Sequence, residues 1–209
     1  MRIIVRAMRV AALCGALAGC AADDSRPANV MDACAIYAAR PHWAEALERS
    51  QARWGAPAPI QLAIIQRESN FRKDARPPMR YALGVVPVGR ASSAYGFAQA
   101  LDGTWDWYRR ETGAHGADRD DFADSADFVG WYMARTARVN GVDMNDAYAH
   151  YLAYHEGHAG YARGRWRTKP GVLRAAAEVE ALARLYEIQL RGCGAARSAA
   201  AAPAPLGAG

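Results

Sequence analysis

The sequence has few of the residues that usually bind metals. Its 209 residues include four cysteines and five histidines. The histidines form no recognisable zinc pattern, and the cysteines do not stand at the spacing of a zinc site. We therefore expect no bound metal and no other cofactor.

Lysine is also scarce, with only Lys73 and Lys169 against many arginines. The full chain has 26 basic and 21 acidic residues, a formal net charge of +5. The first 19 residues hold three arginines and no acid, so the remainder has 23 basic and 21 acidic residues and a net charge of +2. So small a net charge does not support nucleic-acid binding, which depends on many phosphate contacts. We expect no nucleic-acid partner.

No hydrophobic run near the N-terminus is long enough to span a bilayer. Arg2, Arg6 and Arg9 precede a short apolar run from Val10 to Leu17, as in a targeting segment. The run ends in Leu17-Ala18-Gly19-Cys20, which resembles the processing site of bacterial lipoproteins. This resemblance implies lipidation of Cys20, and an ordinary secretory signal is the alternative. Because Ala21 and not Asp follows, we expect a periplasmic protein anchored by lipid to the outer membrane of a two-membrane cell.

Two cysteines remain once Cys14 is assigned to the signal and Cys20 to the lipid. Cys34 and Cys193 flank the predicted folded region. An oxidising, exported compartment permits a disulfide between them. We predict this bond, which would close a loop of about 160 residues.

The composition divides the chain into four parts. We expect a signal at 1–19, a polar tether at 20–30, one domain at 31–193, and a disordered tail rich in alanine and proline at 194–209. The domain is predicted to be mainly α-helical. Its expected helices are 31–39, 41–54, 59–68, 97–111, 121–139, 144–154 and 171–190, with a loop or small hairpin at 76–95.

Glu68 is the leading candidate for chemistry. It closes an apolar helical run in which Ile60, Ile64 and Glu68 lie in one column, so its carboxylate continues a core-facing stripe. Partial burial and the negative end of the helix dipole both raise the pKa of such a carboxyl, which suits a general acid. The alternative is a solvated carboxylate, or one paired with Arg67 or Arg72.

Three segments are relevant to the role of Glu68. They are Glu68-Ser69-Asn70-Phe71, Ser92-Ser93-Ala94-Tyr95-Gly96-Phe97-Ala98-Gln99 and Ala153-Tyr154-His155-Glu156-Gly157. In this order, they resemble the Glu-Ser, Gly-Leu-Met-Gln and Ala-Tyr-Asn-Ala-Gly motifs of lytic transglycosylases with a lysozyme-like catalytic domain. The resemblance covers about residues 57–165. It implies a single lysozyme-like domain that cleaves peptidoglycan glycan strands, acting as a monomer.

The resemblance also implies roles for individual residues. Glu68 is expected to be the catalytic acid, and Tyr154 to donate its hydroxyl to it. The expected substrate contacts are Ser69, Ser93, Tyr95, Gly96, Phe97, Gln99, Tyr154, His155 and Glu156. Gly96 would let the backbone approach the sugar.

The residues themselves leave simpler alternatives open. These are a helix cap for Ser69, loop-fixing hydroxyls for Ser92 and Ser93, a surface amide for Gln99, a core position for Tyr154, and a salt bridge from Glu156 to Arg163 or Arg165.

The chain departs from the family motifs at two places. Phe97-Ala98 replaces the usual Leu-Met, and His155-Glu156 replaces Asn-Ala. The second change adds a carboxylate near the expected cleft, and we hypothesise that Glu156 lines it or raises the pKa of Glu68 by like-charge repulsion.

The expected reaction is cleavage of the β-1,4 bond between N-acetylmuramic acid and N-acetylglucosamine, leaving 1,6-anhydromuramoyl ends. Two alternatives remain. One is a hydrolytic muramidase helped by Glu156 or Asp102, and the other is a peptidoglycan-binding lipoprotein without activity.

Overall fold

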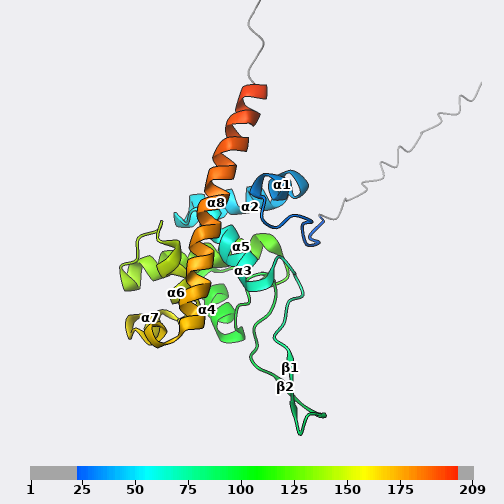
Figure 1. Ribbon diagram of the computed structural model, residues 1–209, viewed down its shortest axis with the longest axis vertical. Helices are drawn as coiled ribbons and strands as arrows, with labels where there is room; N and C mark the ends of the chain where they lie inside the picture. The colour runs from blue at the N-terminus through cyan, green and yellow to red at the C-terminus, as the bar shows by residue number, and fades with distance from the viewer. Residues whose placement is uncertain (1–22, 202–209) are drawn as a thin grey trace, which may run out of the picture.

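Helix α3 (Ala58–Ser69) is the most deeply buried segment of the described chain. A computed structural model describes residues 23–201 and, for 195–201, the backbone alone. Eight of the twelve residues of α3 are buried. The helix packs against α2 (Pro41–Trp54), α5 (Phe122–Asn140) and α8 (Pro170–Ala201), so it is held on several sides (Figure 1).

The predicted mainly helical fold is confirmed. The remaining helices are α1 (Ala33–Ala39), α4 (Asp102–Thr112), α6 (Ala147–Glu156), α7 (His158–Ala162) and the 3₁₀-helix η1 (Arg165–Thr168). The helix expected from Phe97 begins only at Asp102, because residues 96–99 form a turn. Gly96 and Gln99 have φ of 76° and 50° in this turn, which no α-helix accommodates.

Local sequence explains where the helices begin and end. Asp121 and Asp146 cap α5 and α6, since each carboxylate accepts a hydrogen bond from the backbone N–H three residues later. The left-handed conformation ends α2 at Gly55 and α3 at Asn70. Asn70 therefore turns the chain sharply one residue after the last turn of α3.

Aromatic rings fill the core beside α3. Trp43 of α2 stacks on Phe122 with ring centroids 4.0 Å apart and planes 4° from parallel. Phe71 and Phe97 each lie 5.5 Å from the Trp43 ring. These contacts tie the segments after α3 and before α4 to the same core, and so fix the turn that contains Gly96.

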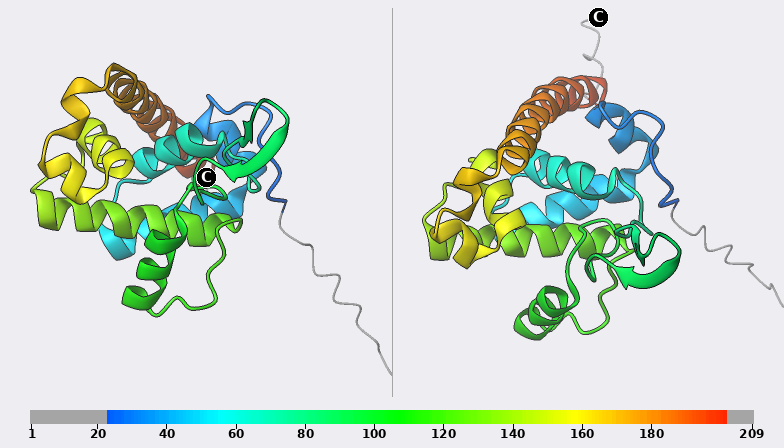
Figure 2. Two further views of the ribbon diagram at one scale, coloured as in Figure 1. Left: turned by 90° about the horizontal axis from the view of Figure 1, so that it is seen from below. Right: turned by 60° about the horizontal axis from the view of Figure 1, so that its bottom comes forward.

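A two-stranded antiparallel hairpin follows α3, as predicted. Strands β1 (Met79–Ala82) and β2 (Val86–Arg90) pair Met79 with Arg90 and Ala82 with Val86, with a bulge between Arg80 and Tyr81. The hairpin projects from the helical body (Figures 1 and 2).

The ends of the described chain differ from two expectations. Residues 23–30 are not a free tether: Arg26 donates hydrogen bonds to the backbone carbonyl and side-chain oxygen of Asn70, and Asp24 accepts one from the Trp43 indole. Helix α8 continues to Ala201, so the first part of the predicted disordered tail is helical. Alanine, the best helix former, predominates over that stretch.

The predicted disulfide between Cys34 and Cys193 is present. It joins α1 to α8 across 159 residues, with the two Cα atoms 6.1 Å apart. Beside it, the Gln189 side chain accepts a hydrogen bond from the Ala33 N–H at 2.8 Å. Both ends of the domain are therefore fastened together.

Within residues 23–201, no helix is both long and apolar enough to span a bilayer. The predicted signal and Cys20 lie outside the described residues.

Candidate active site

Glu68 lies in the last turn of α3 and is partly exposed. Burial of its carboxyl raises the pKa from 4.5 to about 7, against the lowering effects of a hydrogen bond from Tyr151 and of the Arg67 charge. The cost of desolvation exceeds both of these effects. A carboxyl with this pKa carries its proton over much of the neutral range and can donate it.

Glu68 does not form an ion pair with either of the two arginines near it in sequence. Among the described residues, no ion pair involves Glu68, and the guanidinium of Arg67 lies 3.6 Å from Glu178 of α8. Arg72 directs its Nε to the backbone carbonyl of Ser69 at 3.4 Å. The ion-paired alternative considered for Glu68 is therefore not realised.

Tyr151 is the hydroxyl partner of Glu68, and the sequence-based assignment of Tyr154 to that role is wrong. The Tyr151 hydroxyl donates a hydrogen bond to the Glu68 carboxylate, and burial and the Glu68 charge raise its own pKa. Tyr154 donates to the Ala98 carbonyl at 2.6 Å instead. Tyr151 precedes Tyr154 by three residues on α6 and so shares its face, which is the signal that would have identified it.

Gly96 is required for close packing of its turn. A Cβ on Gly96 would lie 1.9 Å from the Arg119 carbonyl oxygen, which already accepts the Phe97 N–H at 3.0 Å. The positive φ of 76° adds to the requirement for glycine. Gly96 therefore has a structural role in this turn.

Phe97 and Gln99 also build the turn. Phe97 is fully buried in the aromatic core, so it is not a substrate contact. The Gln99 amide donates to the carbonyls of Ala75 and Gly96, each at 2.9 Å. Both side chains hold the turn in place. The Ala98 carbonyl in the same turn accepts the hydrogen bond from the Tyr154 hydroxyl.

The two serines have structural contacts as well. Ser69 is buried and donates to the Ile65 carbonyl at 3.1 Å, within its own helix. Ser93 is exposed, and its hydroxyl accepts the Asp102 N–H at 3.1 Å at the start of α4. The contacts match the simpler alternatives for both residues.

Comparison with protein families gives a match to the model described as Transglycosylase SLT domain, over residues 8–193. This match spans most of the 209 residues. The chain belongs to the transglycosylase SLT domain family. Membership indicates a lytic transglycosylase-type enzyme acting on peptidoglycan. A comparison with curated proteins yields no match.

The SLT domain places its altered motif, His155-Glu156, at the end of α6. Glu156 accepts two hydrogen bonds from Lys169 at 2.8 and 2.9 Å, and the His155 ring lies 3.1 Å from it. Lys169 first, and His155 after it, lower the pKa of Glu156. The partner is thus Lys169 and neither Arg163 nor Arg165, and Glu156 is not among the groups that shift the Glu68 pKa.

Tyr95 is a predicted contact that lies close to several charged side chains in this SLT domain. It is partly exposed, and its hydroxyl donates to Asp120 at 3.0 Å. The guanidinium carbons of Arg76 and Arg119 lie 4.1 and 5.4 Å from its ring centroid. This ring therefore lies among charged groups after the hairpin.

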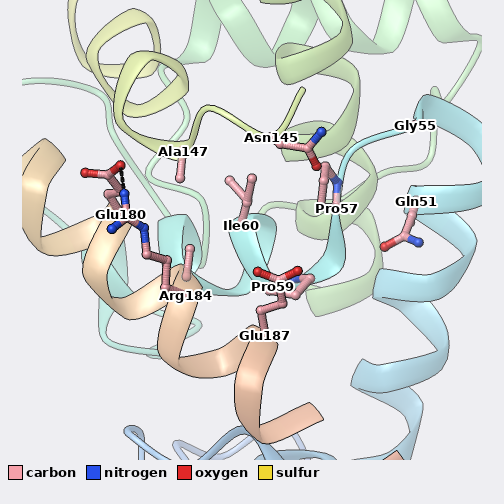
Figure 3. A pocket seen from close by; sticks show the side chains of 11 residues that line it. Gln51, Gly55, Pro57, Pro59, Ile60, Asn145, Ala147, Glu180, Arg184 and Glu187 are labelled. Carbon is pink, nitrogen blue, oxygen red and sulfur yellow. Dashed lines mark hydrogen bonds and ion pairs between the residues drawn. The ribbon is translucent and has the colours of Figure 1, made fainter. Parts of the chain in front are cut away.

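A cavity of about 700 Å³ lies beside Pro59 and Ile60 at the start of α3 (Figure 3). Glu68 lies at the other end of this helix. The lining of the cavity includes Gln51, Pro59, Ile60, Asn145 and Glu187. None of the predicted site residues lines it. Since Ile60 and Glu68 are eight residues apart on one helix, about 12 Å separates this cavity from the acid. This cavity is therefore separate from Glu68 and its neighbours.

Proposed function

We propose that this chain is a peptidoglycan lytic transglycosylase that cleaves the β-1,4 bond between N-acetylmuramic acid and N-acetylglucosamine. The observation that carries the proposal is Glu68, a carboxyl with a pKa near 7 at the end of the central helix, held by Tyr151. Family membership supplies the class of substrate.

The proposed reaction has two proton transfers through the same carboxyl. Glu68 gives its proton to the glycosidic oxygen as the bond from that oxygen to C1 of the muramic acid breaks. The carboxylate then takes the proton of the C6 hydroxyl of the same sugar while O6 bonds to C1. The products are a 1,6-anhydromuramoyl end and a free 4-hydroxyl on the N-acetylglucosamine, no water is consumed, and Glu68 regains its proton.

The contacts of the other carboxylates favour this route over hydrolysis. Hydrolysis by the two-carboxylate route needs a second acid as nucleophile or as base for water. Glu156 is paired with Lys169 at 2.8 Å, and Asp102 with Arg119 at 2.8 Å. Each of the two candidate helpers is therefore engaged with a cation.

We further propose that the enzyme works as a monomer in the periplasm, anchored by lipid on Cys20 to the outer membrane. The support is the sequence alone, through the Leu17-Ala18-Gly19-Cys20 segment and the alanine that follows it. Metabolic labelling with a fatty acid, comparing wild type with Cys20→Ser, tests the anchor. Equal labelling of both would remove it.

Clearance of purified sacculi by wild type and Glu68→Gln tests the proposed acid. We expect the substitution to abolish clearance, because the amide has no proton to donate. The matched control is Glu45→Gln on α2, whose side chain is 68% exposed and distant in sequence from the site. If wild type binds sacculi without clearing them, the chain is a binding protein, and if Glu68→Gln clears at the wild-type rate, Glu68 is not the acid.

A further inference from the structure

The segment after α3 carries an excess of positive charge. Residues 69–101 hold five basic residues, Arg72, Lys73, Arg76, Arg80 and Arg90, and one acid, Asp74. This segment alone therefore has a net charge of +4. Residues 20–209 together have a net charge of only +2, so the remainder is slightly acidic.

These five cations also lack carboxylate partners in the described part of the chain. Ion pairs within 4.0 Å join other basic residues to acids, such as Arg119 to Asp102 and Arg135 to Glu111, but none involves a basic residue of 69–101. Arg72 and Arg90 instead direct single N–H groups to the backbone carbonyls of Ser69 and Pro77. Their remaining donors are available to an anion.

Three of these arginines line one open depression of about 420 Å³. Its lining residues are Arg72, Asp74, Ala75, Arg76, Arg90 and Tyr95. The ring of Tyr95 fixes the Arg76 guanidinium, whose central carbon lies 4.1 Å from the ring centroid. Three guanidinium groups against one carboxylate make a site for an anion, and the planar fork of arginine matches a carboxylate in two parallel hydrogen bonds.

The depression adjoins the turn at residues 96–99 and the end of α3. The Ala75 carbonyl accepts the Gly96 N–H at 3.0 Å and the Gln99 amide at 2.9 Å. The Arg72 N–H donates to the Ser69 carbonyl at 3.2 Å, directly after Glu68. A substrate whose scissile bond lies at Glu68 can therefore extend an anionic branch over this surface.

We infer that the depression binds a carboxylate of the peptide carried by the muramic acid, so that the enzyme prefers glycan strands bearing their peptides. This inference rests on the proposed function. The acetylated sugars of the strand are neutral where the lactyl group is in amide linkage, so the carboxylates of the substrate lie on the peptide branch. The substrate feature that the depression would recognise is therefore a peptide on the cleaved muramic acid, and not a longer glycan chain.

An anionic membrane is the other class of partner for a basic surface next to exposed apolar residues. Leu83 and Val85 at the hairpin tip are 95% and 76% exposed. The arginines of the depression, however, lie with Ala75 and Tyr95 at the base of the hairpin, since Arg72 and Arg76 precede β1 and Arg90 is the last residue of β2. The position of the charges favours the peptide branch.

The test compares kcat/KM on soluble, uncross-linked glycan strands that carry peptides with kcat/KM on the same strands after an amidase has removed them. We expect wild type to prefer the peptide-bearing strands. Arg90→Gln and Arg72→Gln should each reduce the ratio of the two values by about tenfold, as expected for loss of a charge-assisted hydrogen bond. The matched control is Arg80→Gln, which removes a charge from the same hairpin outside the depression and should leave the ratio unchanged.

Several results would overturn the inference. The first is an equal kcat/KM of wild type on both strands. The second is a ratio of the two kcat/KM values that falls as far in Arg80→Gln as in Arg90→Gln. The third is that Arg90→Gln abolishes retention on phosphatidylglycerol vesicles while it leaves this ratio unchanged. Cleavage of neither strand would instead contradict the proposed function. In that event, pull-down of Glu68→Gln with the two strands still tests the inference, which requires tighter retention by the peptide-bearing strand.

Discussion

The Tyr151 hydroxyl donates a hydrogen bond to the Glu68 carboxylate from one turn before Tyr154 on α6. Such a bond favours the charged carboxylate and lowers its pKa, whereas burial favours the protonated form. Burial is the larger effect, since the pKa of Glu68 remains near 7. Tyr151 therefore keeps the acid within reach of neutral pH and orients it.

Substitution of Tyr151 by Phe should move the pH profile of cleavage. Loss of the hydroxyl removes a group that lowers the Glu68 pKa, so the pKa that limits activity on the alkaline side should rise. The measurement is kcat/KM against pH, with Tyr148→Phe on the same helix as the control. An alkaline limb that stays in place, or moves to lower pH, would count against this contact.

The titration of Glu68 should make the free energy of unfolding fall as pH rises. Its folded pKa, about 7, exceeds the unfolded value, so between about pH 4.5 and 7 the unfolded chain binds fewer protons and stability falls. Glu68→Gln lacks this penalty, and its stability advantage over wild type should grow through that window to at most about 3 kcal/mol. Urea unfolding of both proteins at pH 5 and pH 8 measures it. A difference that is the same at both pH values would contradict the buried, protonated acid.

Gly96→Ala should be severely destabilising, by more than about 3 kcal/mol, because its Cβ would lie 1.9 Å from the Arg119 carbonyl oxygen. The matched control is Gly113→Ala, where φ is 74° but no atom lies within 4 Å of the new Cβ. It should cost about 1 kcal/mol from backbone strain alone. Thermal unfolding of the two variants separates the contact from the strain, and equal losses would contradict the packing role of Gly96.

Removal of the disulfide should lower stability with little change in the site. Cys34 and Cys193 are 159 residues apart, and chain-entropy arithmetic gives a loss of about 4 to 5 kcal/mol for Cys34→Ser with Cys193→Ser. Denaturant unfolding measures the loss, and reduced wild type should match the double variant. Stoichiometric thiol labelling of the unreduced, exported protein would show that the bond does not form.

Much of the fold follows from local sequence. Helix α2 spans Pro41–Trp54 as predicted. Proline suits a first helical turn, and Gly55 adopts the left-handed conformation that ends the helix. The column of Ile60, Ile64 and Glu68 predicted the buried face of α3, and Glu68 lies at the end of that face. These features depend on neighbours along one helix, so the periodicity of the sequence contains them.

The remaining site depends on contacts between distant segments. Gly96 is required by Arg119, and Tyr154 by Ala98, at separations that no periodicity reveals. Glu156 pairs with Lys169 because α7 and η1 bring the start of α8 back to the end of α6. The motifs brought these segments together as one candidate site but did not distinguish residues that build the turn from residues left open to a substrate.

The most direct test of the account is the identity of the ends made from purified sacculi digested in water enriched in heavy oxygen. Transglycosylation by Glu68 predicts muropeptides that are lighter by one water than those with reducing muramic acid and that carry no heavy oxygen, with none formed by Glu68→Gln. Reducing ends labelled with heavy oxygen as the main product would contradict it.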